Sequence, residues 1–226
     1  MRTKTLLIAV AAIAAGVVSS QAQSNVYSAN IVGYANITLP AGYTLLNAPL
    51  SPNTTNNAEA LLPSLTSGDQ LLVWNGGGYD VDYFNGPGDW YNGVTFSPIA
   101  QPVLPPGRGY FYQNNTGATK TNTFVGTVGL TNTVTLAAGY TLVGSTAPIA
   151  GSIESTNFNL KFTSGDQVLI WNGGGYDVNY FNGPGDWYNG VSFSPIAVPS
   201  LKVGQGFFYQ NNTGSATNWV ENVVIQ

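Results

Sequence analysis

The sequence predicts an all-β protein of two tandem repeats of about 97 residues, each a small β-sandwich or barrel-like module. Two observations support this prediction. One long segment of the chain occurs twice, and both copies consist of short β-branched and aromatic runs separated by Gly and Pro. The boundaries that we expect are residues 23–128 for module 1 and residues 129–226 for module 2.

The repeat is the strongest signal in the chain. Residues 68–100 recur as residues 165–197 with 29 identical positions in 33, and residues 36–117 align with the second copy at a constant offset of 97. The four differences within the shorter block are Leu71/Val168, Val73/Ile170, Asp82/Asn179 and Thr95/Ser192. Because no Pro-rich or Ser-rich linker separates the copies, we expect the two modules to abut with restricted relative motion.

Turn residues divide each module into short elements. In chain order, module 1 is predicted to have strands at 36–39 and 43–47, a short helix at 56–62, a hairpin of 69–74 with 79–84, and strands at 109–113 and 119–128. The first two strands flank the turn Pro40-Ala41-Gly42, and the hairpin turns at Asn75-Gly76-Gly77-Gly78. These glycines are not a phosphate-binding loop, because the next segment is a strand and no Lys-Ser or Lys-Thr pair follows.

The edges of the two repeats carry three further β-like segments, one more than there are modules. They are Val26–Gly33, Phe124–Gly129 and Trp219–Ile225. If the first segment is not needed in its own module, it can complete a sheet edge in a neighbouring subunit and so join molecules by strand addition. Self-association is therefore one kind of interaction that we expect of this chain.

The first 22 residues have the organisation of a secretory signal peptide. Arg2 and Lys4 precede the apolar stretch 6–18, and Ser20-Gln21-Ala22 has small residues at the two positions that determine cleavage. The stretch is shorter than the roughly 20 residues of a transmembrane helix, and no second apolar run follows it. We expect cleavage after Ala22 and a secreted, extracytoplasmic mature chain without membrane insertion.

Charge and composition exclude several classes of function. The expected mature chain keeps four basic and ten acidic residues, a net charge of −6, which disfavours binding to nucleic acid and to anionic membranes. The chain has no His and no Cys, and so lacks the usual general base, the thiolate nucleophile and a Cys/His zinc site. We therefore expect no catalytic residues and no cofactor, and a hydrolase is the last of three functional hypotheses.

Acidic residues near the hairpin are the remaining candidates for chemistry. Asp80 and Asp82 are two apart on a strand and share a face, as a glycosidase pair would, but Asn179 replaces the second acid in the copy. Strand alternation predicts that both acids face solvent, while Tyr79 and Tyr83 point inward. A calcium site made only of oxygen ligands is a weak alternative, with the donors Asp80, Asp82, Asn85 and Asp89.

Repeated aromatic residues are the candidates for ligand binding. Trp90 and Tyr91 follow a Gly-Pro-Gly turn and point to opposite faces as strand neighbours, so one of them can be exposed. An aromatic ring can cover the C–H face of a sugar while flanking polar groups bond its hydroxyls. The candidate carbohydrate sites are Asp89, Trp90, Tyr91 and Asn92 in module 1 and Asp186, Trp187, Tyr188 and Asn189 in module 2. The alternative is that the indoles cap the cores of the modules.

Each repeat runs from a Gly-aromatic-x-Leu strand through a Trp-centred hairpin to a Pro-Gly-x-Gly-aromatic strand. The matching segments are Gly42-Tyr43-Thr44-Leu45, Trp74-Asn75-Gly76 and Pro106-Gly107-Arg108-Gly109-Tyr110-Phe111, and in the copy Gly139-Tyr140, Trp171-Asn172-Gly173 and Gly204-Gln205-Gly206-Phe207-Phe208. The copy has Val203 where the first repeat has the Pro. This pattern resembles a β-module that is widespread in secreted and surface proteins of Gram-negative environmental bacteria. The resemblance implies a β-fold and no particular chemistry.

The leading functional hypothesis is a secreted, non-catalytic structural or interaction protein of the cell surface or extracellular matrix. Its expected interactions are self-association or contact with a polysaccharide. The alternative is a carbohydrate-binding protein that uses the exposed aromatic residues of each repeat. Solvent exposure of Trp90 and Trp187 distinguishes the two hypotheses.

Overall fold

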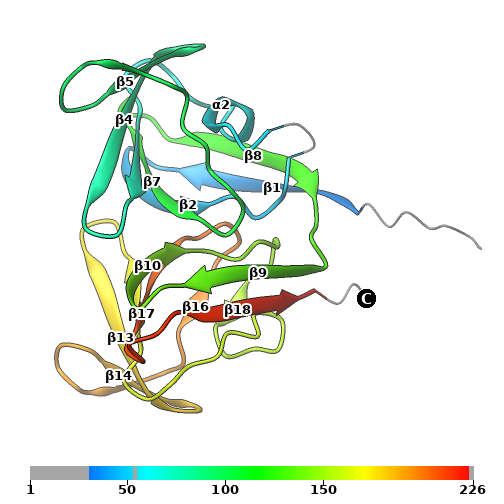
Figure 1. Ribbon diagram of the computed structural model, residues 1–226, viewed down its shortest axis with the longest axis vertical. Coiled ribbons are helices and arrows are strands. Elements are labelled where there is room, and N and C mark those ends of the chain that lie inside the picture. The colour runs from blue at the N-terminus through cyan, green and yellow to red at the C-terminus, as the bar shows by residue number, and fades with distance from the viewer. Residues whose placement is uncertain (1–30, 53–54, 224–226) are drawn as a thin grey trace, which may run out of the picture. The chain divides into compact units, whose positions relative to one another are not determined.

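The computed structural model describes residues 31–52 and 55–223, and it confirms an all-β protein consistent with two tandem β modules (Figure 1). The predicted signal peptide lies outside the described residues, and so do residues 26–30 of the first β-like segment. Within the described ranges, no helix is long and apolar enough to cross a membrane.

The elements follow the repeat in chain order. Module 1 contains β1 (Val32–Leu39), β2 (Gly42–Asn47), α2 (Ala58–Leu61), β3 (Gln70–Trp74), β4 (Tyr79–Gly86), β5 (Asp89–Asn92), β6 (Pro98–Ile99), β7 (Gly109–Asn114) and β8 (Lys120–Thr127). Module 2 contains β9 (Thr131–Leu136), β10 (Gly139–Val143), β11 (Gly151–Ser152), β12 (Gln167–Trp171), β13 (Tyr176–Gly183), β14 (Asp186–Asn189), β15 (Pro195–Ile196), β16 (Ser200–Leu201), β17 (Phe207–Asn211) and β18 (Thr217–Asn222).

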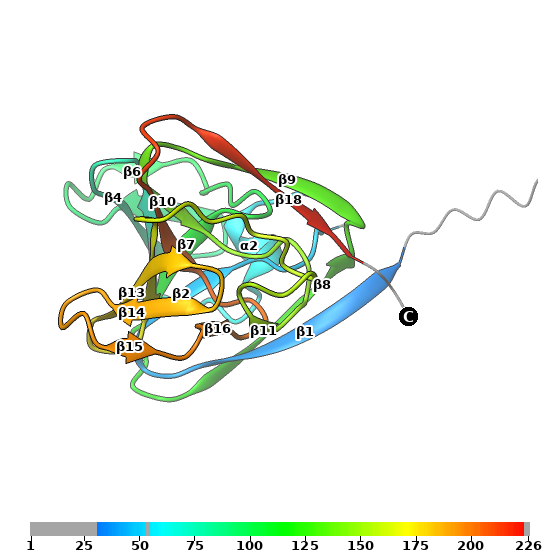
Figure 2. The same cartoon turned by 90° about the horizontal axis from the view of Figure 1, so that it is seen from below.

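Each module contains a six-stranded antiparallel sheet and a separate two-stranded ribbon, and module 2 has a further two-stranded pair, β11-β16 (Figure 1, Figure 2). The sheet order is β2-β7-β3-β4-β5-β6 in module 1 and β10-β17-β12-β13-β14-β15 in module 2, and the ribbons are β1-β8 and β9-β18. β1 and β2 are joined by a tight turn at Gly42, whose φ is 85°, yet they pair with β8 and β7. The turn therefore leads the chain from the ribbon into the sheet and is not a hairpin.

A hydrophobic core fills the space between the ribbon and the sheet of each module. In module 1 the ribbon contributes Leu39 and Phe124, the sheet contributes Leu71 and Tyr110, and all four are almost completely buried. The short helix α2 adds buried apolar side chains to the same core. Module 2 has an equivalent core, closed on the ribbon side by Trp219.

The opposite faces of the two sheets meet in a third apolar cluster, which has approximate twofold symmetry. Trp74 Nε1 donates to the carbonyl of Tyr140 at 3.3 Å, and Trp171 Nε1 donates to the carbonyl of Tyr43 at 3.1 Å. Each residue in the first bond is 97 positions from its counterpart in the second. The buried residues of this cluster are Leu45, Phe111, Leu142 and Phe208. The two modules are thus joined as the subunits of an isologous dimer are joined.

Backbone bonds across the junction follow the same symmetry. Asn47 N donates to the carbonyl of Gly204 at 3.0 Å, and Gly144 N donates to the carbonyl of Gly107 at 3.1 Å. On the axis itself, the hydroxyls of Tyr79 and Tyr176 lie 3.3 Å apart. Burial raises the pKa of both phenols.

The described part of the segment Val26–Gly33 is used within its own module. Val32 and Gly33 pair with Thr127 and Gly126 of β8. The outer edges of the large sheets, β6 and β15, are only two residues long and begin with Pro, which makes them poor templates for a further strand. Strand addition by residues 26–30 stays a prediction.

Candidate functional site

The two predicted ligand-binding tryptophans are core residues. Trp90 and Trp187 are each 1 % exposed, and Trp90 packs against Phe84 with the ring centroids 5.0 Å apart. The cause is the register of β5, which pairs position 90 with Phe84 on the core face of the sheet. A sugar site built on these two indoles is therefore wrong, and the alternative that they cap the cores holds.

A glutamate in each module holds the buried indole together with the turn that precedes it. Glu59 Oε1 accepts hydrogen bonds from Trp90 Nε1 at 2.8 Å and from Gly88 N at 2.9 Å. Glu154 holds Trp187 Nε1 at 3.0 Å and its turn in the same way. The glutamates are 95 positions apart, so the constant offset of 97 fails in this segment. An alignment that allowed a two-residue gap would have paired them.

Tyr91 and Tyr188, the partners of the tryptophans on their strands, lie on the other face of each sheet. Tyr91 pairs across the strands with Tyr83 and Pro98, and the Phe96 ring meets the Tyr83 ring edge-on with centroids 6.3 Å apart. Val94 in the same loop is 74 % exposed, and Phe96 is 67 % exposed. We define the β4–β6 patch as Tyr83, Tyr91, Val94, Phe96 and Pro98 in module 1 and Tyr180, Tyr188, Val191, Phe193 and Pro195 in module 2.

The loop that carries the patch has the same unusual conformation in both modules. Asn92 Oδ1 accepts hydrogen bonds from the backbone N–H groups of Val94 and Thr95 at 2.9 and 2.8 Å. Phe96 has a φ of 56°, and its copy Phe193 has a φ of 54°. A left-handed backbone at a bulky residue costs on the order of 1–3 kcal/mol, so the structure maintains this loop against local strain.

Of the polar residues predicted to flank the ligand, the aspartates lie beside the patch, whereas Asn92 is paired with Asp82 on the other face and holds its own loop. Asp89 accepts a hydrogen bond from Asn85 Nδ2 at 2.6 Å. The same carboxylate raises the pKa of the Tyr91 phenol, first through a hydrogen bond and then through its charge. Asp186 raises the pKa of Tyr188 in the same way.

The prediction that both hairpin acids face solvent is wrong for one of them. Asp80 is exposed, but Asp82 is paired with Leu71 on the core face of the sheet and is only partly exposed. Burial raises the pKa of Asp82 to about 6, and the Asp80 charge adds to this. Because the sheet is covered on both faces near its centre, alternation alone does not identify its core face.

The four weak calcium donors do not converge on one site. Asp80 accepts a hydrogen bond from Asn75 Nδ2 at 2.9 Å, Asp82 faces the core, and Asn85 bonds Asp89. Across residues 31–52 and 55–223, no group of three or more His, Cys, Asp or Glu side chains is placed to hold a metal ion.

Among the described residues, Asp69 is the carboxylate that accepts the most hydrogen bonds, and its role is structural. It is completely buried and accepts hydrogen bonds from Lys120 Nζ at 2.5 Å and from the Tyr112 hydroxyl at 2.6 Å. Burial alone would raise the pKa of Asp69, but the bonds from Lys120 and Tyr112, with those from two backbone N–H groups, outweigh burial and lower it. Module 2 keeps Asp166 and Tyr209 without a lysine, so the network ties strands together in both modules and does not depend on the ion pair.

Comparison with protein-family models, with curated proteins and with solved structures gives no match to this chain. Each module presents an exposed aromatic patch with a carboxylate beside it, on strands β4–β6 and their copies β13–β15. Such a surface is suited to binding an amphipathic ligand, since its rings offer apolar faces and its edges offer hydrogen bonds.

Proposed function

We propose that this chain is a secreted, non-catalytic interaction protein of the cell surface or extracellular matrix that binds a polysaccharide through the β4–β6 patch of each module. The observation that carries the proposal is the pattern of identity between the copies. Leu71 and Val73 are buried and differ between the copies, whereas Val94 and Phe96 are exposed and are the same in both. Packing does not demand identical exposed apolar side chains, but a shared ligand does.

The chemistry of the patch favours a sugar over other partners. Its tyrosine, phenylalanine and proline rings present apolar faces to the C–H side of a pyranose. Asp89 lies two positions before Tyr91 on the same strand, beside its phenol, and can bond hydroxyl groups. A polyanion is a poor partner, because the expected mature chain has four basic residues against ten acidic ones.

Two patches in one chain provide bivalent binding to a polymer. Once one patch is bound, the second binds as an intramolecular event, and the apparent affinity exceeds that of either patch alone. The shared apolar cluster between the sheets holds the modules together, so this gain requires no new contact. Removal of one patch is expected to weaken binding much more than twofold.

The test is depletion of purified residues 23–226, the chain expected after signal cleavage, by a panel of insoluble polysaccharides. We expect one matrix to deplete the wild type, with partial loss for Phe96→Ala and full loss for Phe96→Ala/Phe193→Ala. Tyr34→Ala is the matched control, because Tyr34 is 74 % exposed on β1 and lies outside the patch. Equal depletion of the double variant, or equal loss in the control, would contradict the proposal.

A further inference from the structure

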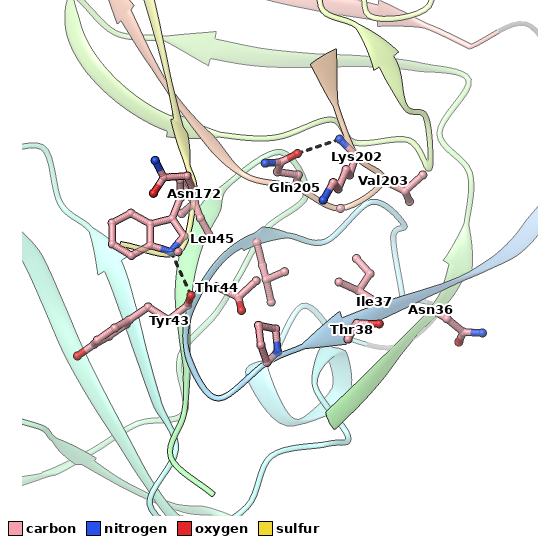
Figure 3. Close-up of a pocket in the computed structure, with 15 residues that line it drawn as sticks. Asn36, Ile37, Thr38, Tyr43, Thr44, Leu45, Asn172, Lys202, Val203 and Gln205 are labelled. Carbon is pink, nitrogen blue, oxygen red and sulfur yellow. Dashed lines mark hydrogen bonds between the residues drawn. The ribbon is translucent and has the colours of Figure 1, made fainter. Parts of the chain in front are cut away.

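A cleft of about 570 Å³ lies between the two modules (Figure 3), and no residue of either patch lines it. One wall comes from β1, β2 and the turn between them, and the other from residues 171–173 and 202–205. Its volume is within the range of small-molecule sites, about 300–1,000 Å³. None of the residues predicted from the sequence to bind a ligand lines it.

The twofold symmetry places an equivalent recess on the other side of the axis, and the residues that line the two recesses are not all the same. On the wall formed by residues 202–205, the residues that differ are Lys202, Val203 and Gln205 here and Pro105, Pro106 and Arg108 there. In the counterpart, Arg108 Nη2 reaches the carbonyl of Trp74 at 3.3 Å, so the guanidinium lies across the space. Here Gln205 Oε1 accepts a hydrogen bond from Lys202 N at 2.9 Å, which folds the shorter side chain back on its own turn. The cleft therefore stays open on one side of the axis.

An unsatisfied hydroxyl group marks the wall formed by module 1. Thr44 Oγ1 is buried and has no hydrogen-bond partner in the described part of the chain. Its copy, Thr141 Oγ1, accepts from Ala137 N at 3.0 Å. Pro40 occupies the equivalent position and has no N–H to give. An unpaired buried hydroxyl is unfavourable, and rotation about χ1 can turn it to a ligand in the cleft.

Lys202 gives the cleft its charge. It is exposed and is the charged side chain among the lining residues, which include no Asp or Glu. Within residues 31–52 and 55–223 its ammonium group forms no ion pair. Figure 3 shows Lys202, Val203 and Gln205 on one side of the cleft and Ile37, Thr38 and Thr44 on the other.

We propose that this cleft binds a hydroxylated carboxylate of the uronic acid type. The carboxylate accepts a charge-assisted hydrogen bond from the ammonium of Lys202. A ring hydroxyl pairs with Thr44, and the apolar side of the sugar lies against Ile37, Val203 and the indole of Trp171. This site is independent of the β4–β6 patches and goes beyond the function proposed for them.

The first test is NMR titration of the purified protein with glucuronate, reading the indole N–H signals. We expect the Trp171 signal to shift and the Trp74 signal, its twofold counterpart, to stay in place. Glucose supplies the hydroxyls without the charge and acetate supplies the charge without the hydroxyls, so each should bind at least tenfold more weakly than glucuronate. No shift at millimolar glucuronate, or equal shifts with acetate, overturns the proposal.

Variants locate the site and check its chemistry. Lys202→Gln is expected to weaken glucuronate binding about tenfold, the loss of one charge-assisted bond. Lys161→Gln makes the same charge change at an exposed lysine outside the cleft and should have no effect. Gln205→Arg copies the filled counterpart and should abolish binding while the melting temperature is kept. Equal losses for the two lysine variants, or full binding by Gln205→Arg, overturn the site.

Two sources of the ligand are separated by comparing the free sugar acid with an oligosaccharide that ends in it. Tighter binding of the oligosaccharide, still lost in Lys202→Gln, identifies the end of an acidic polysaccharide. Equal binding of the two identifies the free sugar acid. The variant Phe96→Ala/Phe193→Ala should bind both as the wild type does, so failure of the patch proposal and failure of this one are distinguishable.

Discussion

The carboxyl group of Asp82 lies on the core face of its sheet, where burial raises its pKa to about 6 from an ordinary value of 3.8. The folded state therefore prefers the protonated acid. Below pH 4 the acid is protonated in both the folded and the unfolded chain, and the raised pKa has no effect on stability. As the pH rises from about 4 to about 6, the unfolded chain loses this proton more readily than the folded one, and the folded state is increasingly destabilised. Above that range the penalty is constant.

Replacement of Asp82 by Asn should remove this penalty. Module 2 already has Asn179 at the equivalent position, where its amide donates to the carbonyls of Val168 and Asp177 at 3.0 Å. We expect Asp82→Asn to stabilise the protein by about 1–2 kcal/mol at pH 7, after allowance for solvent screening, and by little at pH 4. Urea unfolding at the two pH values measures this.

The control for this prediction is Asp177→Asn, the same change at an exposed position of β13, where Asn179 stands in place of Asp82 and has no charge to titrate. Its effect on the free energy of unfolding should be small at both pH values. A gain from Asp82→Asn that is equal at pH 4 and pH 7 would show that packing, not ionisation, is responsible.

At the scale of single residues, the sequence did not determine which of two neighbouring rings is buried. Neighbouring positions on a strand face opposite ways, so one of Trp90 and Tyr91 had to be buried. Which one depends on the register of β5 against β4, and register is set by pairing with residues that lie elsewhere in the chain. The position of Asp82 was missed for the same reason.

Among the elements, the β4–β5 hairpin depends on one glutamate from α2. The side chain of Glu59 satisfies both the Trp90 indole and the backbone N–H of Gly88. Glu59→Ala leaves a buried donor unpaired and should lower the free energy of unfolding by about 2–3 kcal/mol. Urea unfolding followed by tryptophan fluorescence measures the loss.

Two related variants test the hydrogen-bond explanation. Glu59→Gln keeps a carbonyl oxygen as acceptor and should lose less stability than Glu59→Ala. Glu154→Ala removes the equivalent acceptor of module 2 and should lose as much. If the Gln and Ala variants are equally stable, the glutamate does not anchor the hairpin.

Turn chemistry made the local elements predictable. The pairing between distant strands could not be predicted from it. The Gly-rich turn after Asn75 joins β3 and β4 as a hairpin, in agreement with the prediction, because its signals lie within four residues. The similar signal at Pro40-Ala41-Gly42 joins two strands that do not pair with each other. A turn motif specifies a change of direction, whereas the partner of each strand is chosen by contacts far along the chain.

On the scale of the whole molecule, the twofold junction relies on residues that are not the same on its two sides. The side chain of Asn47 is completely buried, and its Nδ2 donates to the carbonyl of Ser145 at 2.5 Å. The equivalent position is Gly144, and a Cβ added there would lie 2.2 Å from the Asn47 Cγ. The amide of one module thus fills space that the other module leaves empty.

Gly144→Ala should therefore destabilise the protein by overpacking, by about 1–3 kcal/mol. Asn47→Gly removes the atoms in conflict and should recover part of this loss in the double variant. Denaturant unfolding of all four proteins gives the coupling energy of a double-mutant cycle, which we expect to be at least about 1 kcal/mol. Additive effects would show that the two positions do not share space.

The duplication predicted two modules, but it did not specify the surface that joins them. A signal was present in the strands, since β3 reads Leu71-Leu72-Val73-Trp74 and β7 reads Tyr110-Phe111-Tyr112. Uninterrupted apolar runs are typical of strands that are buried on both faces. The cleft was beyond prediction, because it depends on Arg108 and Gln205 adopting different conformations at equivalent positions.

The complementary pair at positions 47 and 144 has a consequence for the history of the gene. A homodimer encoded by a single-module gene carries the same residue on both sides of its axis, so two asparagines would collide and two glycines would leave a void. Fusion of two gene copies removes that constraint, because each half can then mutate independently of the other. The fused chain can keep its outward surfaces in duplicate while one of two equivalent recesses acquires a role of its own.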